Sequence, residues 1–86
     1  MSLNLPLDAP PLRILIVEDD PMMQLGLEQS LMSYPQLEIV GRAEDGYLGV
    51  QAALKLKPDL VVMDIGLPRL DGIAATQQIK AALPQT

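Results

Sequence analysis

Three short apolar runs alternate along the chain with longer segments in which apolar positions recur about every three or four residues, as on one face of a helix. The runs are rich in Leu, Ile and Val, which is typical of buried strands, and they occupy residues 13–18, 37–43 and 60–63. The intervening patterns predict helices from Pro21 to about Tyr34, from Tyr47 to about Leu56 and from Gly72 to Leu83. The repeated strand–helix order predicts a parallel sheet with right-handed crossovers.

The periodicity also predicts which helical side chains face the sheet. On the first helix, the polar residues Gln24, Glu28 and Gln29 are expected to point away from it. The expected inward positions are Met23, Leu27 and Leu31 on the first helix, Val50, Ala53 and either Leu54 or Leu56 on the second, and Ile73, Thr76, Ile79 and Leu83 on the third.

Acidic and turn-forming residues mark the ends of the predicted elements. Asp20 is the expected N-cap of the first helix, with Pro21 at its first position. Asp71 precedes the third helix and is expected to cap it in the same way. The segments 44–46 and 57–59 are rich in Asp, Gly and Pro, which indicates turns.

The composition is that of one small domain with an aliphatic core. The chain has 86 residues, of which 49% are hydrophobic, but it contains no Phe or Trp. Residues 1–12 hold three of the eight prolines and show no periodicity, so we expect a flexible leader there and a folded domain over residues 13–86.

Several classes of chemistry are excluded by the residues that are missing. The chain has no cysteine and no histidine, so disulfides, thiol catalysis, zinc–thiolate sites and histidine general bases are ruled out. The net charge is −5 and the six basic residues are scattered, which argues against direct contact with nucleic acid. No apolar run approaches the roughly 20 residues of a membrane span, so a cytoplasmic module is expected. Any catalysis or metal binding must use carboxylates and backbone oxygens.

Three carboxylates follow two of the predicted strands. Glu18 and Asp19 lie where the first strand ends, and Asp64 lies where the third ends. The carboxyl ends of parallel strands share one edge of the sheet, so these side chains are expected to converge. Converging carboxylates repel one another and favour a bound cation, for which Mg²⁺ is suited by its preference for hard oxygen ligands. A divalent ion beside Asp64 would also allow that carboxylate to attack an incoming phosphoryl group.

Two other interpretations of these residues remain. Asp19 and Asp20 could serve only to cap the first helix. A mononucleotide-binding domain is the second, but it needs a glycine-rich turn after the first strand to hold phosphate. Three acids and Pro21 stand there instead, with no glycine before Gly26, and their charge would repel a nucleotide. We rank this interpretation last.

The segments "RILIVEDDP", "GRAEDGYLGVQAA" and "KPDLVVMDIGLPRLDGI" together resemble the receiver domain of bacterial two-component response regulators. The resemblance covers residues 13–83 and is nearest to the LuxR/NarL-like branch, whose members carry helix-turn-helix output domains. It implies a flavodoxin-like (CheY-like) doubly wound parallel sheet. The family's strand order is 2-1-3-4-5, of which this sequence supplies only the 2-1-3 part.

The resemblance also implies a function and assigns roles to residues. Asp64 would accept a phosphoryl group from a partner histidine kinase, and the domain would switch an output or partner surface rather than turn over a substrate. A DNA-binding output domain could follow in the parent protein. Pro68 and Gly72 would shape the loop after the phosphoacceptor. The implied Mg²⁺ ligands are Glu18, Asp19, Asp64 and the backbone carbonyl of Gly66.

The pattern departs from the family because it stops after the third helix. The family's Ser/Thr and Lys on later strands have no counterpart, and Thr76 and Lys80 lie within the predicted third helix, so neither is assigned these roles. The third strand would then be an exposed edge, and we expect either a longer parent protein or self-association through that edge. An alternative function is therefore a degenerate receiver that acts as a dimerisation or interaction module without phosphotransfer.

Overall fold

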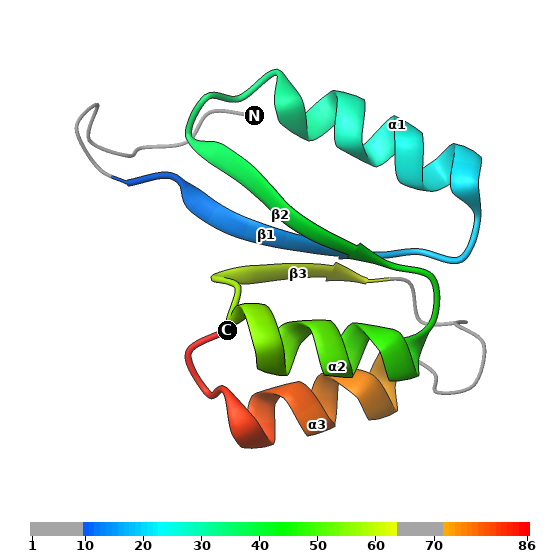
Figure 1. The fold of residues 1–86 in the computed structure, drawn as a ribbon, viewed down its shortest axis with the longest axis vertical. Helices are drawn as coiled ribbons and strands as arrows, with labels where there is room; N and C mark the ends of the chain where they lie inside the picture. Colours follow the sequence, from blue (N-terminus) through cyan, green and yellow to red (C-terminus); the bar gives the residue numbers. More distant parts are fainter. Residues whose placement is uncertain (1–9, 64–71) are drawn as a thin grey trace.

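The computed structural model describes residues 10–63 and 72–86 (Figure 1). Within these residues it has a parallel sheet of three strands, as the strand–helix pattern predicts, in the order β2-β1-β3 that the family resemblance implies. The elements in chain order are β1 (Leu12–Val17), α1 (Pro21–Met32), β2 (Leu37–Ala43), α2 (Gly46–Leu56), β3 (Leu60–Met63) and α3 (Gly72–Ala82).

Element boundaries differ from the predictions by one or two residues. β2 and β3 have the predicted bounds, whereas β1 begins and ends one residue early. Leu12 joins the strand because its N–H donates to the carbonyl of Gln36 at 2.8 Å. α1 ends at Met32 rather than near Tyr34, whose N–H instead donates to the carbonyl of Leu31 in a closing turn. α3 ends one residue before Leu83.

N-cap residues explain where two of the helices, α1 and α2, begin. Asp20 caps α1 as predicted, since its Oδ1 accepts from the N–H of Met22 at 2.9 Å. Asp45, which the sequence placed in a turn, is also a cap, and its Oδ1 accepts from the N–H of Leu48 at 2.8 Å. This bond starts α2 one residue earlier than predicted. The predicted cap Asp71 lies outside the described residues.

The sheet is covered on both faces, with α1 on one side and α2 and α3 on the other (Figure 1). The main core lies on the α2/α3 side, because alternate residues of β1 point there. Ile14 and Ile16 of β1 are fully buried and belong to the opposite face, towards α1. The core cluster comprises Leu15, Val17, Ala43, Val50, Ala53, Ala75 and Ile79.

Glycine lets the backbone of α2 approach the end of β1. A Cβ atom on Gly49 would lie 2.9 and 3.0 Å from the two Cγ atoms of Val17, closer than side-chain carbons normally come. Val17 is the last residue of β1 and is fully buried. The close contact between Gly49 and Val17 therefore holds the end of β1 against α2.

The strand register aligns the carboxyl ends of the sheet. Val17 of β1 pairs with Ala43 of β2 on one side and with Met63 of β3 on the other. The β1–β2 ladder has one irregularity, between Ile14 and Leu15, which leaves Val40 without a partner in the register. Because of this extra residue on β2, Ala43 rather than Arg42 lies level with Val17.

The prediction for the inner face of α1 is partly wrong. Met23 is 55% exposed, and no residue of α1, all of which is described, is fully buried. Gln24 and Glu28, predicted to point away, instead face the sheet and make polar contacts with it. Leu27 and Leu31 are half-buried, as their predicted positions require.

The inner faces of the other helices are set by small residues. Val50 and Ala53 of α2 are buried as predicted, and of the two alternatives Leu56 packs at the core while Leu54 is exposed. On α3, Ile79 is buried, but Ile73 is 59% exposed and the prediction for it is wrong.

Thr76 of α3 is also exposed, against the prediction, and Leu83 just beyond the helix packs at the border of the core. The buried positions of α3 are Gly72, Ala75 and Ile79, two of which have little or no side chain. Periodicity weighted by hydrophobicity favours large side chains, so it overlooked these small residues where α3 lies against the core.

Candidate functional site

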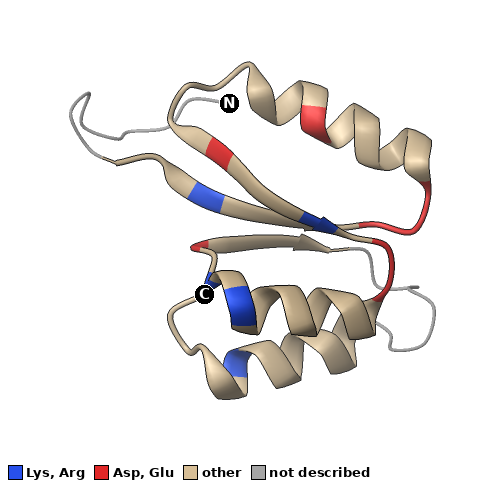
Figure 2. Cartoon of the chain, viewed as in Figure 1, with Lys and Arg blue, Asp and Glu red and all other residues tan. Residues whose placement is uncertain are grey.

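Acidic side chains gather at the carboxyl edge of the sheet. Because Val17, Ala43 and Met63 are aligned, the segments that leave β1, β2 and β3 all start at this edge. Figure 2 shows acidic positions in red where β1 joins α1 and where β2 joins α2. This is the edge at which open α/β sheets bind their ligands.

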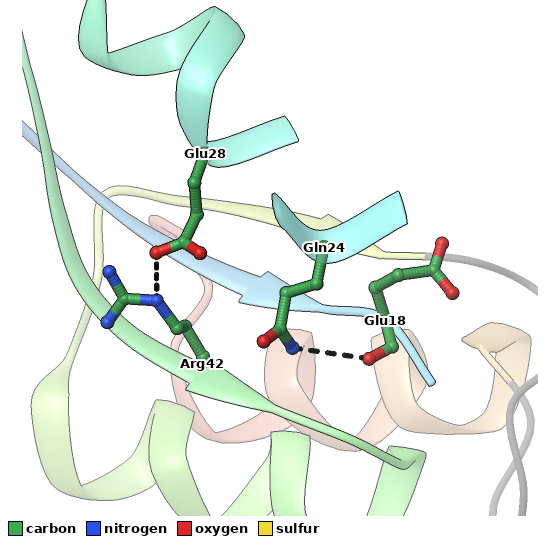
Figure 3. A network of polar contacts seen from close by, with 4 residues as sticks. All are labelled: Glu18, Gln24, Glu28 and Arg42. Carbon is green, nitrogen blue, oxygen red and sulfur yellow. Dashed lines mark hydrogen bonds and ion pairs between the residues drawn. The ribbon is translucent and has the colours of Figure 1, made fainter. Parts of the chain in front are cut away.

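Glu18 is enclosed at this edge, with a relative exposure of 8%, the same as that of Asp45. Its N–H donates to the carbonyl of Ala43 at 3.0 Å, which extends the β1–β2 pairing by one bond beyond the strand. Its Oε2 accepts from the N–H of Asp20 at 3.2 Å, and its carbonyl oxygen accepts from Nε2 of Gln24 at 3.3 Å (Figure 3). The residue is therefore held through its backbone and through its carboxylate.

Asp19 differs from both of its neighbours. It is exposed, and no hydrogen bond or ion pair joins its carboxylate to the part of the chain that the structure describes. Asp20 alone accepts from the first turn of α1. The interpretation in which Asp19 and Asp20 both serve as caps therefore applies only to Asp20.

The structure describes only some of the predicted site residues. Glu18 and Asp19 are adjacent at the edge, and Gly72 is buried at the start of α3, where its carbonyl accepts from Oγ1 of Thr76 at 2.7 Å. Asp64, Gly66 and Pro68 lie outside the described residues. Residues 10–63 and 72–86 contain no group of three or more His, Cys, Asp or Glu that could hold a metal ion. The two described acids offer hard oxygen atoms, which fit Mg²⁺.

Thr76 and Lys80 both lie in α3, as predicted. Nζ of Lys80 donates to the carbonyls of Pro84 and Thr86 at 2.9 and 2.5 Å. Oγ1 of Thr86 in turn donates to the carbonyl of Pro58, just before β3 begins. Lys80 is thus engaged near the amino end of β3, at the opposite edge from Glu18.

Gln24 lies at this edge, although the sequence pattern predicted that its side chain points away from the sheet. Its position offered a signal, because it lies in the first turn of α1, four residues after the cap Asp20. A side chain there can reach back to the segment that precedes the helix.

No described helix is long and apolar enough to cross a membrane.

The chain resembles known proteins of one family. The family model described as "Response regulator receiver domain" matches residues 14–86. The chain belongs to the response regulator receiver family. Such receivers are the regulatory domains of two-component systems, so both the predicted family and the predicted fold class are confirmed.

Relatives of this receiver occur in proteins with different outputs. It is 49% identical over 85% of its length to a protein-glutamate methylesterase/protein-glutamine glutaminase of Geobacter sulfurreducens, and 41% identical over 79% of its length to the transcriptional regulatory protein LiaR of Bacillus subtilis. LiaR is a regulator of the LuxR/NarL type, the branch that the sequence predicts. The matches cover only 20% and 32% of those two proteins.

Solved structures support the same fold. The response regulator domain of Thermotoga maritima CheB matches with a TM-score of 0.84 and 39% identity, over 87% of this chain and 56% of that one. The CheX–CheY–BeF₃–Mg²⁺ complex of Borrelia burgdorferi matches with a TM-score of 0.78 and 30% identity, over 84% of this chain and 55% of that one.

Proposed function

We propose that this receiver accepts a phosphoryl group on Asp64 from a partner histidine kinase, in a reaction that depends on Mg²⁺. One observation carries the proposal. Val17 pairs with Met63, so the ends of β1 and β3 are adjacent. Glu18 and Asp19 follow the first of these ends in the sequence, and Asp64 follows the second. These 86 residues contain no histidine, so the phosphohistidine donor must lie outside them.

The proposed transfer needs one nucleophile on this chain. A carboxylate oxygen of Asp64 attacks the phosphorus atom, a P–O bond forms, and the P–N bond to the kinase histidine breaks. The phosphohistidine ring is protonated on its other nitrogen, so the leaving nitrogen takes the bonding electron pair and the ring departs as neutral imidazole. The product is an acyl phosphate on Asp64, and the domain itself turns over no substrate.

Glu18 and Asp19 have the chemistry to hold Mg²⁺ for this reaction, with the carboxylate of Asp64 and the carbonyl of Gly66 completing the proposed ligand set. The bound ion would neutralise charge on the transferred phosphoryl group. The proposal is supported by the different burial and hydrogen bonding of the two described acids. Glu18 is enclosed and held by hydrogen bonds, whereas Asp19 is exposed and its carboxylate makes no hydrogen bond or ion pair with a described residue.

Incubation with acetyl phosphate and Mg²⁺ tests the proposal. Intact-mass and peptide analysis should locate one added phosphoryl group on Asp64, and Asp64→Asn should abolish it. Glu44→Gln is the matched control, because Glu44 is an exposed acid at the same edge and is not assigned to the site. An unmodified Asp64, or equal labelling of Asp64→Asn and wild type, would contradict the proposal.

Phosphorylation would serve to switch a surface that another domain or protein reads. The chain spans about a fifth of the methylesterases and about a third of the transcriptional regulator that it resembles. We propose an output domain of one of these kinds, such as a DNA-binding domain, as the reader in the parent protein.

An interaction module without phosphotransfer is the second candidate function. It is favoured by exposed apolar side chains beside β3, since Leu60 is 46% and Ile73 59% exposed, and β3 pairs only with β1 among the described strands. Self-association through this edge would appear as a mass that rises with concentration in sedimentation, and Leu60→Lys should suppress it. Self-association without any response to Mg²⁺ would favour this second function over the first.

A further inference from the structure

Polar contacts join the first helix to the acidic edge. Nε2 of Gln24 donates to the carbonyl of Glu18, and one turn later Glu28 forms an ion pair with Arg42 of β2 (Figure 3). The described α1 buries no residue fully, so apolar packing alone does not fix its placement. The contact from Gln24 is the one that reaches the candidate site.

The peptide group that leads from Glu18 into Asp19 is held by this contact. The N–H of Glu18 is bound by the carbonyl of Ala43 on β2, and the carbonyl of Glu18 is bound by Gln24 on α1. A peptide unit is planar, so a fixed carbonyl also fixes the direction in which the chain enters the next residue. The Val17–Glu18 peptide is thus held by β2, and the Glu18–Asp19 peptide that follows it is held by Gln24 of α1.

Asp19 depends on this backbone for its direction. Its carboxylate has no hydrogen bond or ion pair with any residue in the described ranges, so no side-chain partner aims it. The position of the exposed Asp19 carboxylate therefore depends on how firmly the backbone of the Glu18–Asp19 turn is held. Gln24 is the one α1 side chain with a described hydrogen bond to that turn.

We infer that Gln24 is a positioning residue for Asp19, which holds the Glu18 carbonyl and so fixes the turn that presents the Asp19 carboxylate to Mg²⁺. The inference rests on the proposed function, in which Asp19 is a Mg²⁺ ligand. Loss of one intramolecular hydrogen bond corresponds to about a two- to tenfold change in an equilibrium constant. Removal of the Gln24 amide should therefore weaken Mg²⁺ binding about two- to tenfold.

Gln24→Met is the test, because methionine keeps the length and packing of the side chain but has no N–H donor. Gln29→Met is the matched control, since Gln29 is an exposed glutamine on the same helix. Mg²⁺ dissociation constants from calorimetric titration and urea midpoints are measured for both. We expect weaker Mg²⁺ binding only in Gln24→Met, together with faster exchange of the Asp20 amide in metal-free protein. Gln24→Ala provides the same comparison if methionine prevents folding.

The outcomes separate this inference from the proposed function. Equal Mg²⁺ affinity of Gln24→Met and Gln29→Met would overturn the positioning role while wild-type phosphorylation continued to support the function. Wild-type protein that neither binds Mg²⁺ nor accepts phosphate would overturn both. A urea midpoint that falls in Gln24→Met with unchanged Mg²⁺ affinity would show a purely structural residue and would also overturn the inference.

Discussion

The close approach of Gly49 to Val17 leads to a testable prediction about position 49. Replacing Gly49 by alanine places a methyl group 2.9 and 3.0 Å from the Cγ atoms of Val17. Val17 is fully buried in the centre of the sheet and β-branched, so its side chain cannot rotate away easily. The substitution Gly49→Ala should therefore overpack the junction of α2 and β1.

Two opposing terms set the size of the effect. Alanine is better than glycine inside a helix by about 1 kcal/mol. Overpacking a filled core costs about 1–3 kcal/mol. Gly26→Ala isolates the first term, because Gly26 is an exposed residue of α1 and its added Cβ would meet nothing within 4 Å. The propensity terms cancel in the comparison, so Gly49→Ala should be less stable than Gly26→Ala by about 1–3 kcal/mol.

Urea unfolding followed by circular dichroism measures this difference if the three proteins share one m-value. We expect Gly26→Ala to raise the midpoint and Gly49→Ala to leave it unchanged or lower it. In a double-mutant cycle, Val17→Ala should relieve part of the cost of Gly49→Ala, since it removes the methyl groups that clash. Equal stabilisation by the two alanine substitutions would refute the packing argument.

Three further substitutions test the cap of α2 and the inner face of α3. Asp45→Ala should lower the free energy of unfolding by about 1 kcal/mol, because it removes the acceptor for the N–H of Leu48, and a urea midpoint equal to that of wild type would contradict the capping role. Ile79→Ala should cost about 2–5 kcal/mol in thermal or urea unfolding, since Ile79 is only 2% exposed. Ile73→Ala should change stability by less than about 0.5 kcal/mol, since Ile73 is 59% exposed, and a cost as large as that of Ile79→Ala would place Ile73 in the core after all.

The strands could be predicted from the sequence because their signals are local and strong, whereas their order was implied by the family resemblance. Runs of Leu, Ile and Val flanked by Pro, Gly and Asp predicted β2 and β3 with the observed bounds. The alternation with helices then determined a parallel sheet, and the observed order β2-β1-β3 agrees with the resemblance. The Asp20–Pro21 pair likewise predicted the start of α1.

The inner faces of the helices were harder to predict, because packing rather than hydrophobicity decides them. On α3, Gly72 and Ala75 are on the inner face and Ile73 is on the outer face. A prediction based on large apolar residues gives the opposite assignment. On α1, Gln24 points inward because it donates to the Glu18 carbonyl, and Glu28 points inward because it pairs with Arg42. Both partners lie outside the helix. Helical periodicity contains no information about such partners.

The candidate site was predicted in part. The strand pattern placed Glu18 and Asp19 at the carboxyl edge, and the structure agrees. The separate roles of Asp19 and Asp20 needed the hydrogen-bond geometry, because both residue types are common caps. The roles of Asp64 and Gly66 come from the family resemblance and remain predictions.

The unequal covering of the two sheet faces has a consequence for how this domain can diverge. On the α2/α3 side, Gly49, Ala53 and Ala75 leave little room, so larger side chains there would force the helices away from the sheet. On α1, Met22, Leu25 and Met32 are 81%, 53% and 71% exposed, and their replacement leaves no cavity. The outer surface of α1 can therefore accept many sequences at little cost in folding, while the α2/α3 layer preserves the frame that holds the acidic edge.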